Sequence, residues 1–423
     1  MVIVKAKRWN IVVFGETLVY RDYLPLLGKK IVVGLTAGAA IYRSMDLIRM
    51  LRRMGAEVRV VMTRESTKLI GTELVKWAAG SQPYVETTGW VEHVELAKWC
   101  DTTVIAPATL KTMVKIANGY TDELLPLLAT VSLGYGKRVI VVPAMNIGLY
   151  RSPQYVNTAD KLEKQGVVVI PPLIEEDKAK YPPLEDLAYC IEVITSRGVD
   201  LKGRRFLITS GATREYIDPV RVITNPSSGL MGRLLALESA CRGGVVDYIR
   251  GFVTVKTPYL VREYIGLTNS ELANWIERLT DQYLYDAVIL AAAPVDFTVL
   301  SKSSRKIESR ATETLTITLK PGIKVAKYVS KKNKPLVKVI FAAETTDNYE
   351  ELVEKARVKI IDYEASFCIA HRLSSEAGFT SEYLDACYVD LSDSVCYGKV
   401  RKEFIARMII DRISTMLSRN FAH

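Results

Sequence analysis

Several features that would assign this chain of 423 residues to particular protein classes are missing from its sequence. Its six cysteines are scattered without a C-x-x-C pair or a regular spacing, which argues against a zinc site and does not indicate a disulfide framework. No run reaches the roughly 18 consecutive apolar residues that a membrane helix needs. Residues 1–23 carry charges throughout and lack the apolar core of a signal peptide. We therefore expect a cytoplasmic protein without a membrane partner.

Positive charge is in excess but is not gathered into a basic run. The chain has 57 Lys and Arg against 47 Asp and Glu, a net charge of +10. This excess suits anionic ligands such as nucleotides or phosphorylated metabolites, or it reflects a generally basic surface. No basic run flanked by aromatic residues and no nucleic-acid motif is present, so a nucleic-acid-binding protein is the less favoured alternative. Salt-dependent binding to nucleic acid would reveal it.

The apolar pattern indicates an α/β protein with two domains. A chain of this length is too long for one ordinary core. Short Val- and Ile-rich runs alternate with amphipathic segments from residue 29, lapse into Gly and charge around residues 196–206, and then restart. We predict two doubly wound, Rossmann-like domains with mainly parallel sheets. The predicted boundaries are an N-terminal extension at 1–28, a first domain at 29–195, a linker at 196–203 and a second domain at 204–423.

Three junctions between strand and helix in the first half carry small or polar residues. "GLTAGAAIYRS" places Thr36 and Gly38 where backbone N–H groups and a helix dipole can hold phosphate. "APATLKTMVKIANG" adds Thr109, and "PAMNIGLY" adds Asn146. His93 lies near the start of a predicted helix in "EHVELAKWCD". Ligands of doubly wound folds bind outside the carboxyl ends of the strands, so these junctions are candidate binding positions.

The motifs "HVELAKWCDTTVIAPATLKTMVKIANG" and "PAMNIGLY" resemble those of flavin-dependent cysteine decarboxylases, in particular phosphopantothenoylcysteine decarboxylases. The resemblance covers residues 30 to about 170 and implies a flavodoxin-like flavoprotein domain. It implies that His93 is the catalytic histidine and that Asn146 holds the substrate carboxylate. The residues that it places at FMN are Thr36, Gly38, Thr63, Pro107, Ala108 and Thr109.

The chemistry of that family accounts for these residue types. A cysteine carboxylate cannot simply lose CO2, because the resulting carbanion has no group to accept its charge. Oxidation of the thiol by the flavin provides such a group, and the flavin later returns the hydride. A histidine beside the thiol can accept its proton, and an asparagine amide can orient the carboxylate without neutralising it.

One segment departs from that family. Many relatives have a Gly-rich flap whose cysteine protonates the intermediate, whereas this chain has "EEDKAKYPPLEDLAYC", in which Cys190 comes too late. Lys178 and Lys180 can replace the cysteine if burial and a neighbouring cation lower their pKa toward neutrality. Otherwise the first half is impaired in its reductive step. An extended flap would point both lysines to one face.

The stretch "SGATREYIDPVRVITNPSSGLMG" at residues 210–232 resembles the signature of phosphopantothenate–cysteine ligases. The resemblance runs from about residue 203 to 418 and implies a nucleotide-binding ligase domain. Asn225 matches the asparagine that contacts the acyl-cytidylate intermediate, and Arg221 matches the arginine beside it at the substrate. Ser228 and Gly229 begin a helix whose N-terminus faces phosphate. Leu230 stands where the family has a lysine.

Further matches follow in chain order. Lys306 aligns with the catalytic lysine, on a mobile loop that would close over the acyl phosphate. "CIAHRLSSEAGF" departs from the family's IANDVS, so we assign no catalytic role to His371. The residues that the resemblance places at the nucleotide, CTP, are Ser228, Gly229, Leu290, Ala291, Ala292, Asp296, Lys306, Pro321, Gly322, Ile323, Lys324, Phe341, Lys355 and Lys359.

Together the two resemblances imply a fused enzyme of coenzyme A biosynthesis. The ligase half would use CTP with Mg2+ to join 4′-phosphopantothenate to cysteine through an acyl cytidylate. The other half would decarboxylate the product to 4′-phosphopantetheine with FMN. The family also implies a homo-oligomer, and the metal ligands are not assigned. Two alternatives remain, namely a ligase with an FMN-binding but inactive first half and a flavin- and nucleotide-binding regulator without catalysis.

Overall fold

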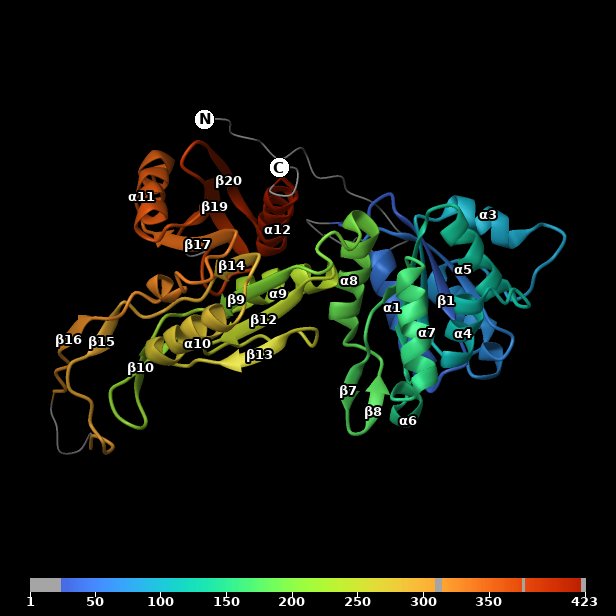
Figure 1. Cartoon of the computed structure of the whole chain (residues 1–423), viewed down its shortest axis with the longest axis horizontal. Coiled ribbons are helices and arrows are strands. Elements are labelled where there is room, and N and C mark those ends of the chain that lie inside the picture. The colour runs from blue at the N-terminus through green and yellow to red at the C-terminus, as the bar shows by residue number, and fades with distance from the viewer. Residues whose placement is uncertain (1–23, 309–313, 375–376, 420–423) are drawn as a thin grey trace. The chain divides into compact units, whose positions relative to one another are not determined.

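The computed structural model describes residues 24–308, 314–374 and 377–419. The chain divides between Val199 and Asp200 into two compact units, each with its own β-sheet (Figure 1). Within these described ranges, no helix is long and apolar enough to cross a membrane.

The first unit contains a five-stranded parallel sheet with strand order β2-β1-β3-β4-β6. Counted along the chain, this is the order 2-1-3-4-5 of flavodoxin-like doubly wound folds. The strands are almost continuously buried, as expected when helices cover both faces. They are β1 (Lys30–Leu35), β2 (Glu57–Met62), β3 (Thr102–Ala108), β4 (Arg138–Pro143) and β6 (Val168–Val169).

Helices α3, α4, α5 and α7 share one apolar core with alternate residues of the strands, such as Val32, Ile105 and Val141. Helices α1 and α8 pack against each other and contribute nothing to that core, so they cover the opposite face. The helical segments are η1 (Ala39–Tyr42), α1 (Arg43–Arg53), η2 (Ser66–Lys68), α2 (Thr72–Ala79), α3 (Glu92–Trp99), α4 (Leu110–Asn118), α5 (Leu124–Gly134), α6 (Ile147–Tyr150), α7 (Pro153–Lys164) and α8 (Leu184–Arg197).

A small antiparallel sheet of three strands lies in the same unit, in the order β5-β8-β7. Its strands are β5 (Met145–Asn146), β7 (Leu173–Glu175) and β8 (Lys178–Lys180). The β7–β8 turn consists of Glu176 and Asp177, which both have positive φ, as two-residue hairpin turns of type I′ require. The "EEDKAK" segment is therefore a tight β-hairpin.

The second unit contains an eight-stranded sheet with strand order β13-β12-β9-β14-β17-β18-β19-β20. The first six positions are parallel and correspond to the order 3-2-1-4-5-6 of dinucleotide-binding folds. Strands β19 and β20 complete the sheet as an antiparallel pair. The strands are β9 (Arg205–Ser210), β12 (Val245–Arg250), β13 (Arg262–Ile265), β14 (Ala287–Leu290), β17 (Val337–Glu344), β18 (Phe367–Arg372), β19 (Tyr383–Val389) and β20 (Ser394–Arg401).

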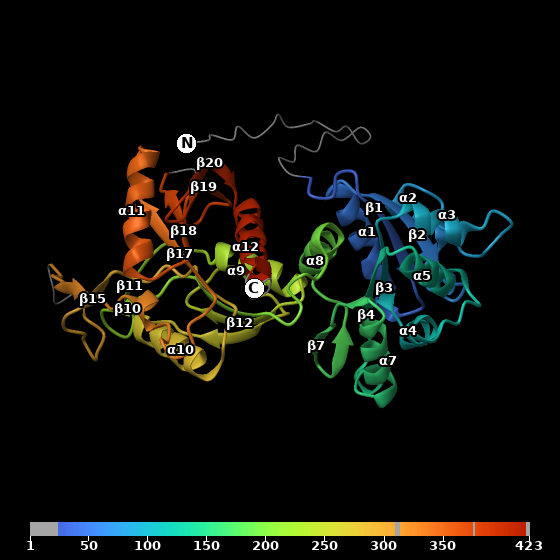
Figure 2. The same ribbon diagram turned by 45° about the horizontal axis from the view of Figure 1, so that its top comes forward.

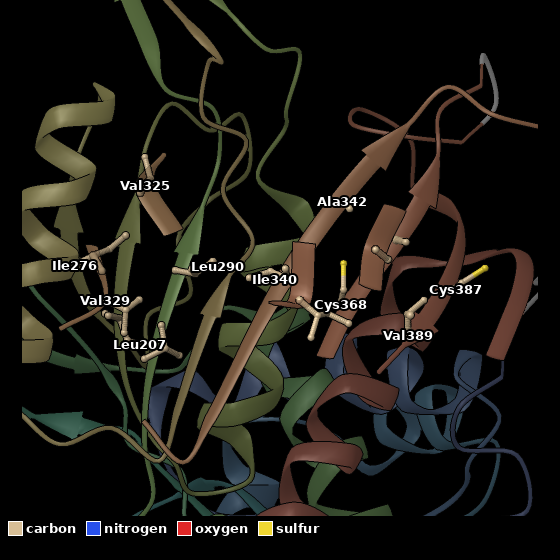
Figure 3. Packing of buried hydrophobic residues seen from close by; sticks show 14 of the residues in the cluster. Leu207, Ile276, Leu290, Val325, Val329, Ile340, Ala342, Cys368, Cys387 and Val389 are labelled. Atoms are coloured by element: carbon tan, nitrogen blue, oxygen red, sulfur yellow. The ribbon is translucent and has the colours of Figure 1, made fainter. Parts of the chain in front are cut away.

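Helices also cover both faces of this second sheet. The core in Figure 3 joins alternate strand residues such as Leu290, Ile340 and Cys368 to side chains of α10, η4 and α11. Helices α9 and α12 pack together on the other face, and both ribbon views show α11 and α12 on opposite sides of β17–β20 (Figures 1 and 2). These helical segments are α9 (Leu230–Cys241), α10 (Asn269–Gln282), η4 (Val325–Tyr328), α11 (Tyr349–Asp362) and α12 (Lys402–Arg419).

Two short antiparallel pairs project from the connections of the second sheet. The polar stretch between β9 and α9 folds into β10 (Arg214–Tyr216) and β11 (Val222–Thr224), and the connection after β14 forms β15 (Phe297–Val299) and β16 (Leu319–Pro321). Both belong to β-α junctions at the carboxyl edge of the parallel strands.

The predicted fold class of two doubly wound α/β domains is confirmed by these sheet orders. A disulfide within the second unit was not indicated by the scattered cysteines. Cys387 and Cys396 form a disulfide across neighbouring positions of β19 and β20. The bond could not be predicted from the sequence, because its two cysteines meet only through the register of that strand pair.

Candidate active sites

The first unit has a polar junction at its switch point, between the carboxyl ends of β1 and β3. Thr36 follows β1 and is fully buried. Its hydroxyl donates to the carbonyl of Pro107 at 2.7 Å and accepts from the backbone N–H of Thr109 at 3.1 Å. Thr109 is the N-cap of α4, so the first turn of that helix faces the same junction. Two side-chain hydrogen bonds thus fix the turn after β1 against the start of α4.

The other residues predicted at FMN lie at the same edge of the sheet. Gly38 donates its backbone N–H to the carbonyl of Thr36 at 2.8 Å, and a Cβ atom there would be 3.5 Å from Pro107. Thr63 directly follows β2 and is buried. Ala108 is the fully buried last residue of β3. The sheet therefore gathers the predicted FMN residues along the ends of β1, β2 and β3.

His93 lies in the first turn of α3. Because α3 leads directly into the start of β3, its N-terminus lies toward the carboxyl edge of the sheet. The Nδ1 atom of His93 is buried, and among the described residues it has no hydrogen-bond partner. Buried polar atoms are nearly always paired, so this nitrogen fits a site that a bound molecule completes.

Asn146 lies at the end of β5 and caps α6. Its Oδ1 accepts from the backbone N–H of Gly148 at 2.7 Å. This bond fixes the amide so that the Nδ2 group remains available to donate to a carboxylate. In the β5–β8 pairing, Asn146 lies directly opposite Lys178. The hairpin thereby brings one of the two predicted flap lysines beside the predicted carboxylate ligand.

The second flap lysine does not have the environment that a proton donor needs. Lys180 is ion-paired with Glu176 at 2.8 Å and with Glu175 at 3.4 Å. The hydrogen bond to Glu176 raises the pKa of Lys180, although burial opposes the shift. The prediction required a pKa lowered toward neutrality, and the structure gives Lys180 a shift of the opposite sign.

The second unit has a pocket of about 290 Å³ at its own switch point, at the carboxyl ends of the neighbouring strands β9 and β14. Nine of the fourteen residues predicted at the nucleotide line it. They are Gly229, Leu290, Ala291, Ala292, Asp296, Ile323, Lys324, Phe341 and Lys359. Asn225 lines the same pocket. The other five predicted nucleotide residues are not among its lining residues, and they are Ser228, Lys306, Pro321, Gly322 and Lys355.

Two segments of the chain that are predicted to bind the nucleotide meet at one end of this pocket. Lys324 is ion-paired with Asp296 at 2.7 Å, and the backbone N–H of Gly322 donates to the Asp296 carbonyl at 2.8 Å. Pro321 pairs with Phe297 in the β15–β16 hairpin. Gly322 and Pro321 therefore support the pocket wall without lining it.

Asn225 holds the loop after β14 with its amide. Its Nδ2 donates to the carbonyl of Pro294 at 2.9 Å and, more weakly, to that of Ala293 at 3.4 Å. This arrangement leaves the amide oxygen as the group that Asn225 can offer to a ligand. The residue thus connects the β11–α9 loop with the pocket wall after β14.

Arg221 and the loop that carries Lys306 lie outside the pocket, and the carboxylate of Asp218 binds both. The Asp218 carboxylate accepts hydrogen bonds from the backbone of Val220 and Arg221, from the Arg221 guanidinium and from the N–H of Ile307. Arg221 also donates to the Ile307 carbonyl at 3.1 Å. Although burial opposes it, these hydrogen bonds lower the pKa of Asp218 to about 2. The turn after β10 therefore holds the loop that carries Lys306.

Lys355 and Lys359 lie one turn apart on α11, and both contact the carboxylate of Glu344. The distances are 3.5 Å from Lys355 and 2.7 Å from Lys359, and Lys355 also pairs with Glu351 at 2.7 Å. Only Lys359 of the two lines the pocket. Their charges are thus partly compensated within the chain.

Comparison with known proteins relates both units of the chain to one family of fused proteins. The flavoprotein family matches residues 21–196, and the DNA/pantothenate metabolism flavoprotein C-terminal domain family matches residues 201–417. The chain is 36% identical over 397 residues to the coenzyme A biosynthesis bifunctional protein CoaBC of Thermococcus kodakarensis, covering 93% of this chain and 96% of the relative. It is 33% identical to CoaBC of Methanocaldococcus jannaschii, covering 93% and 95%. The CoaBC of Escherichia coli is 32% identical, with 93% and 98% covered.

The chain belongs to the CoaBC family. The predicted resemblance to fused coenzyme A biosynthesis enzymes is thereby confirmed. Its first half is a flavoprotein domain, as the matched family indicates. The individual site residues remain predictions.

Two pocket residues of this CoaBC-family chain were not predicted from the sequence. Lys402 begins α12 and is only 3% exposed, and burial lowers its pKa to about 8. His371 is 6% exposed, and burial together with the charges of Lys402 and Lys359 lowers its pKa to about 4. No sequence signal identified Lys402, because a lysine at a helix start is usually on the surface.

A Mg2+ ion at this site would be held mainly by the phosphates of the nucleotide. In the part of the chain that the structure describes, no group of three or more His, Cys, Asp or Glu side chains could hold a metal ion. Mg2+ is commonly held by substrate phosphates with one or two carboxylates rather than by a complete protein cage.

Proposed function

We propose that this chain catalyses two consecutive steps of coenzyme A biosynthesis. The second unit joins 4′-phosphopantothenate to cysteine at the expense of CTP, and the first unit decarboxylates the resulting phosphopantothenoylcysteine to 4′-phosphopantetheine. The chain acts as a homo-oligomer, as the family resemblance implies, and in the cytoplasm, as the sequence without a signal peptide or membrane segment leads us to expect. Family membership supports the pairing of the two activities.

One observation carries the ligase assignment. A single pocket at the switch point of a 3-2-1-4-5-6 sheet gathers nine predicted nucleotide residues, although the sequence spreads them from Gly229 to Lys359. Nucleotides bind at that position in such sheets. A carboxylate must be activated before an amine can attack it, because the two otherwise exchange only a proton. CTP supplies the activation by forming an acyl cytidylate, with Mg2+ bound to its phosphates.

Residue roles in the ligase follow from position. Asn225 offers its amide oxygen to the intermediate, while its Nδ2 keeps the loop after β14 in place. Lys306 acts from a loop outside the pocket, so it must move toward the phosphate to stabilise the displaced oxygens. Lys324 and Lys359 bind the nucleotide by exchanging part of their pairing with Asp296 and Glu344 for phosphate oxygens.

The decarboxylase assignment rests on the polar junction in the first unit. The residues present fit FMN, because Thr36 and Thr109 fix a turn against the N-terminus of α4, where a phosphate can be held. When bound, FMN supplies the oxidation and reduction of the substrate. His93 accepts the thiol proton at its Nδ1, which has no hydrogen-bond partner among the described residues, and Asn146 orients the carboxylate with its Nδ2.

A second candidate is a ligase whose first half binds FMN without turnover. The ion pairs of Lys180 favour it, because a lysine with a raised pKa is a poor proton donor at neutral pH. Lys178, opposite Asn146, is then the flap residue that must act if the decarboxylase works.

The test measures both halves separately on the full chain. CMP release is followed with 4′-phosphopantothenate, cysteine and CTP, and CO2 release is followed with phosphopantothenoylcysteine and FMN. Lys306→Ala should abolish CMP release, retain CTP binding and leave CO2 release unchanged, which makes CO2 release its internal control. Unchanged CMP release from Lys306→Ala would contradict the assignment of that lysine. CMP release without CO2 release from the wild type would favour the second candidate.

A further inference from the structure

A valine in the left-handed region of backbone conformation stands two residues before His93. Val91 has a φ of 50° and a ψ of 48°. Three other non-glycine residues in the described ranges have positive φ, namely Glu176, Asp177 and Glu364, and none of them is β-branched. The left-handed conformation is an outlier for a β-branched residue, because its Cβ atom crowds the following carbonyl oxygen. The backbone at Val91 is therefore strained.

Packing of the valine side chain does not compensate for this strain. Val91 is 49% exposed, so its burial contributes little. A glycine adopts positive φ without strain, and the loop contains one at position 89, which is not among the glycines with positive φ. The flexible residue thus lies beside the strained position rather than at it. Strain of this kind persists only where the surrounding contacts enforce it, and it is concentrated at functional sites.

Hydrogen bonds between Thr88 and Glu92 enforce the conformation of the loop. The Glu92 carboxylate accepts from the backbone N–H of Thr88 at 2.8 Å and from the Thr88 hydroxyl, and we call these two bonds the Thr88–Glu92 clamp. The same hydroxyl accepts from the N–H of Trp90 at 3.3 Å, and the Thr88 carbonyl accepts from the N–H of Val91 at 3.3 Å. Glu92 is only 8% exposed, and the hydrogen bonds from Thr88 hold the pKa of its carboxyl below the usual range.

The strained residue determines the direction in which α3 begins. Val91 is the N-cap of α3, and its carbonyl accepts from the N–H of Val94 at 2.8 Å and from that of Glu95 at 3.3 Å. The first turn of the helix therefore follows the φ and ψ angles of Val91. His93 lies in that turn, and its buried Nδ1 has no hydrogen-bond partner among the described residues. A rotation at Val91 would thus move the imidazole relative to the edge of the sheet.

We infer that the Thr88–Glu92 clamp positions the imidazole of His93 by holding Val91 in the left-handed region. This inference rests on the proposed function, in which His93 accepts the thiol proton. Without the clamp, Val91 relaxes to an extended or right-handed conformation, and the first turn of α3 moves with it. A proton acceptor must lie within hydrogen-bond reach of the thiol, so this displacement slows the reaction. Thr88 and Glu92 are positioning residues, because they act through His93 rather than on the substrate.

The experiment is a double-mutant cycle on the full chain with FMN, in which CO2 release from phosphopantothenoylcysteine is measured. Glu92→Ala should lower kcat about 5- to 30-fold, the factor by which a residue with a Cβ atom disfavours the left-handed conformation. The KM and the yellow colour of bound FMN should be unchanged. In the Val91→Gly background the same substitution should cost less than about threefold, because glycine adopts positive φ without strain. Glu92→Gln should retain most of the rate, since its amide can accept from the Thr88 N–H and donate to the Thr88 hydroxyl.

Two controls and a second readout accompany the cycle. Glu73→Ala removes an exposed glutamate from the first turn of α2, so it tests the general effect of an acidic side chain at a helix start and should leave CO2 release unchanged. CMP release should be unchanged in every variant. Thermal unfolding is independent of FMN turnover, and Val91→Gly should not lower its midpoint, although replacing valine by glycine ordinarily does.

Equal CO2 release from Glu92→Ala and the wild type would overturn the positioning role of the clamp. An equal loss with and without Val91→Gly would overturn it as well, since Glu92 would then act by a route that does not involve the strained residue. If Glu92→Ala does not fold, the same cycle with Thr88→Val, which removes one of the two hydrogen bonds of the clamp, decides. A wild type that releases CMP but no CO2 would instead refute the proposed decarboxylase, and the role of the clamp with it.

Discussion

Two histidines show how single residues identify the candidate sites. His93 in the first unit and His371 in the second each have a buried Nδ1 without a hydrogen-bond partner among the described residues. Leaving such an atom unpaired costs on the order of 1–3 kcal/mol, so it is retained mainly where function compensates. Sequence reasoning selected His93 through its motif but rejected His371, because the surrounding segment departs from the family.

Replacing His93 separates a role in catalysis from a role in cofactor binding. His93→Asn should keep the yellow colour of bound FMN, since Thr36 and Thr109 form the predicted phosphate site. CO2 release should fall at least about 100-fold, because the thiol loses its proton acceptor. Absorption spectra and CO2 assays on the same preparation provide both readouts. A colourless variant would assign His93 to flavin binding or to folding.

Acidification should destabilise the second unit through His371. Burial lowers its pKa from 6.5 to about 4, so the folded state disfavours the charged form. The contribution of neutral His371 to the free energy of unfolding is therefore fully present above about pH 6.5. It is lost as the pH drops toward 4, and the loss reaches about 3 kcal/mol. The His371→Asn variant should lack this pH-dependent loss of stability. Unfolding curves at pH 7 and pH 4.5 check it, and equal pH dependence in both proteins would contradict the buried neutral histidine.

At the scale of elements, the active positions are junctions between a parallel strand and the next helix. The alternation of apolar runs predicted these junctions well, because buried strands and amphipathic helices have distinct periods. Three features could not be predicted. The β10–β11 and β15–β16 hairpins depend on pairing between segments of only three residues, and the ion pairs of Lys180 depend on a two-residue turn. The position of Lys402 depends on how α12 packs against α9.

Gly232 determines how closely α9 approaches β9. A Cβ atom there would lie 2.4 Å from the side chain of Ser210, so no larger residue fits without moving the helix. Gly232→Ala should destabilise the protein by about 1–3 kcal/mol, as overpacking does. CMP release should fall with it, because the first turn of α9 lines the pocket. Gly134→Ala, in α5 with nothing within 4 Å, is the control and should be neutral or mildly stabilising.

Thermal unfolding and CMP assays on both glycine variants measure these effects. Equal stability and equal ligase activity in Gly232→Ala and Gly134→Ala would show that α9 can shift freely. Close packing of α9 against β9 would then not require a glycine at position 232.

At the scale of the whole molecule, two complete doubly wound units share one chain. Each has its own parallel sheet, its own core and its own switch point. The proposed product of the second unit is the proposed substrate of the first, which gives a functional reason for the fusion. The net charge of +10 suits ligands that all carry phosphate or carboxylate groups.

The most direct test supplies purified protein with FMN, Mg2+, CTP, 4′-phosphopantothenate and cysteine, and follows the products by mass spectrometry. The account predicts transient phosphopantothenoylcysteine followed by saturated 4′-phosphopantetheine, with one CO2 released for each CMP. Accumulation of phosphopantothenoylcysteine without CO2 would contradict the bifunctional assignment, and absence of both products would contradict the ligase assignment as well.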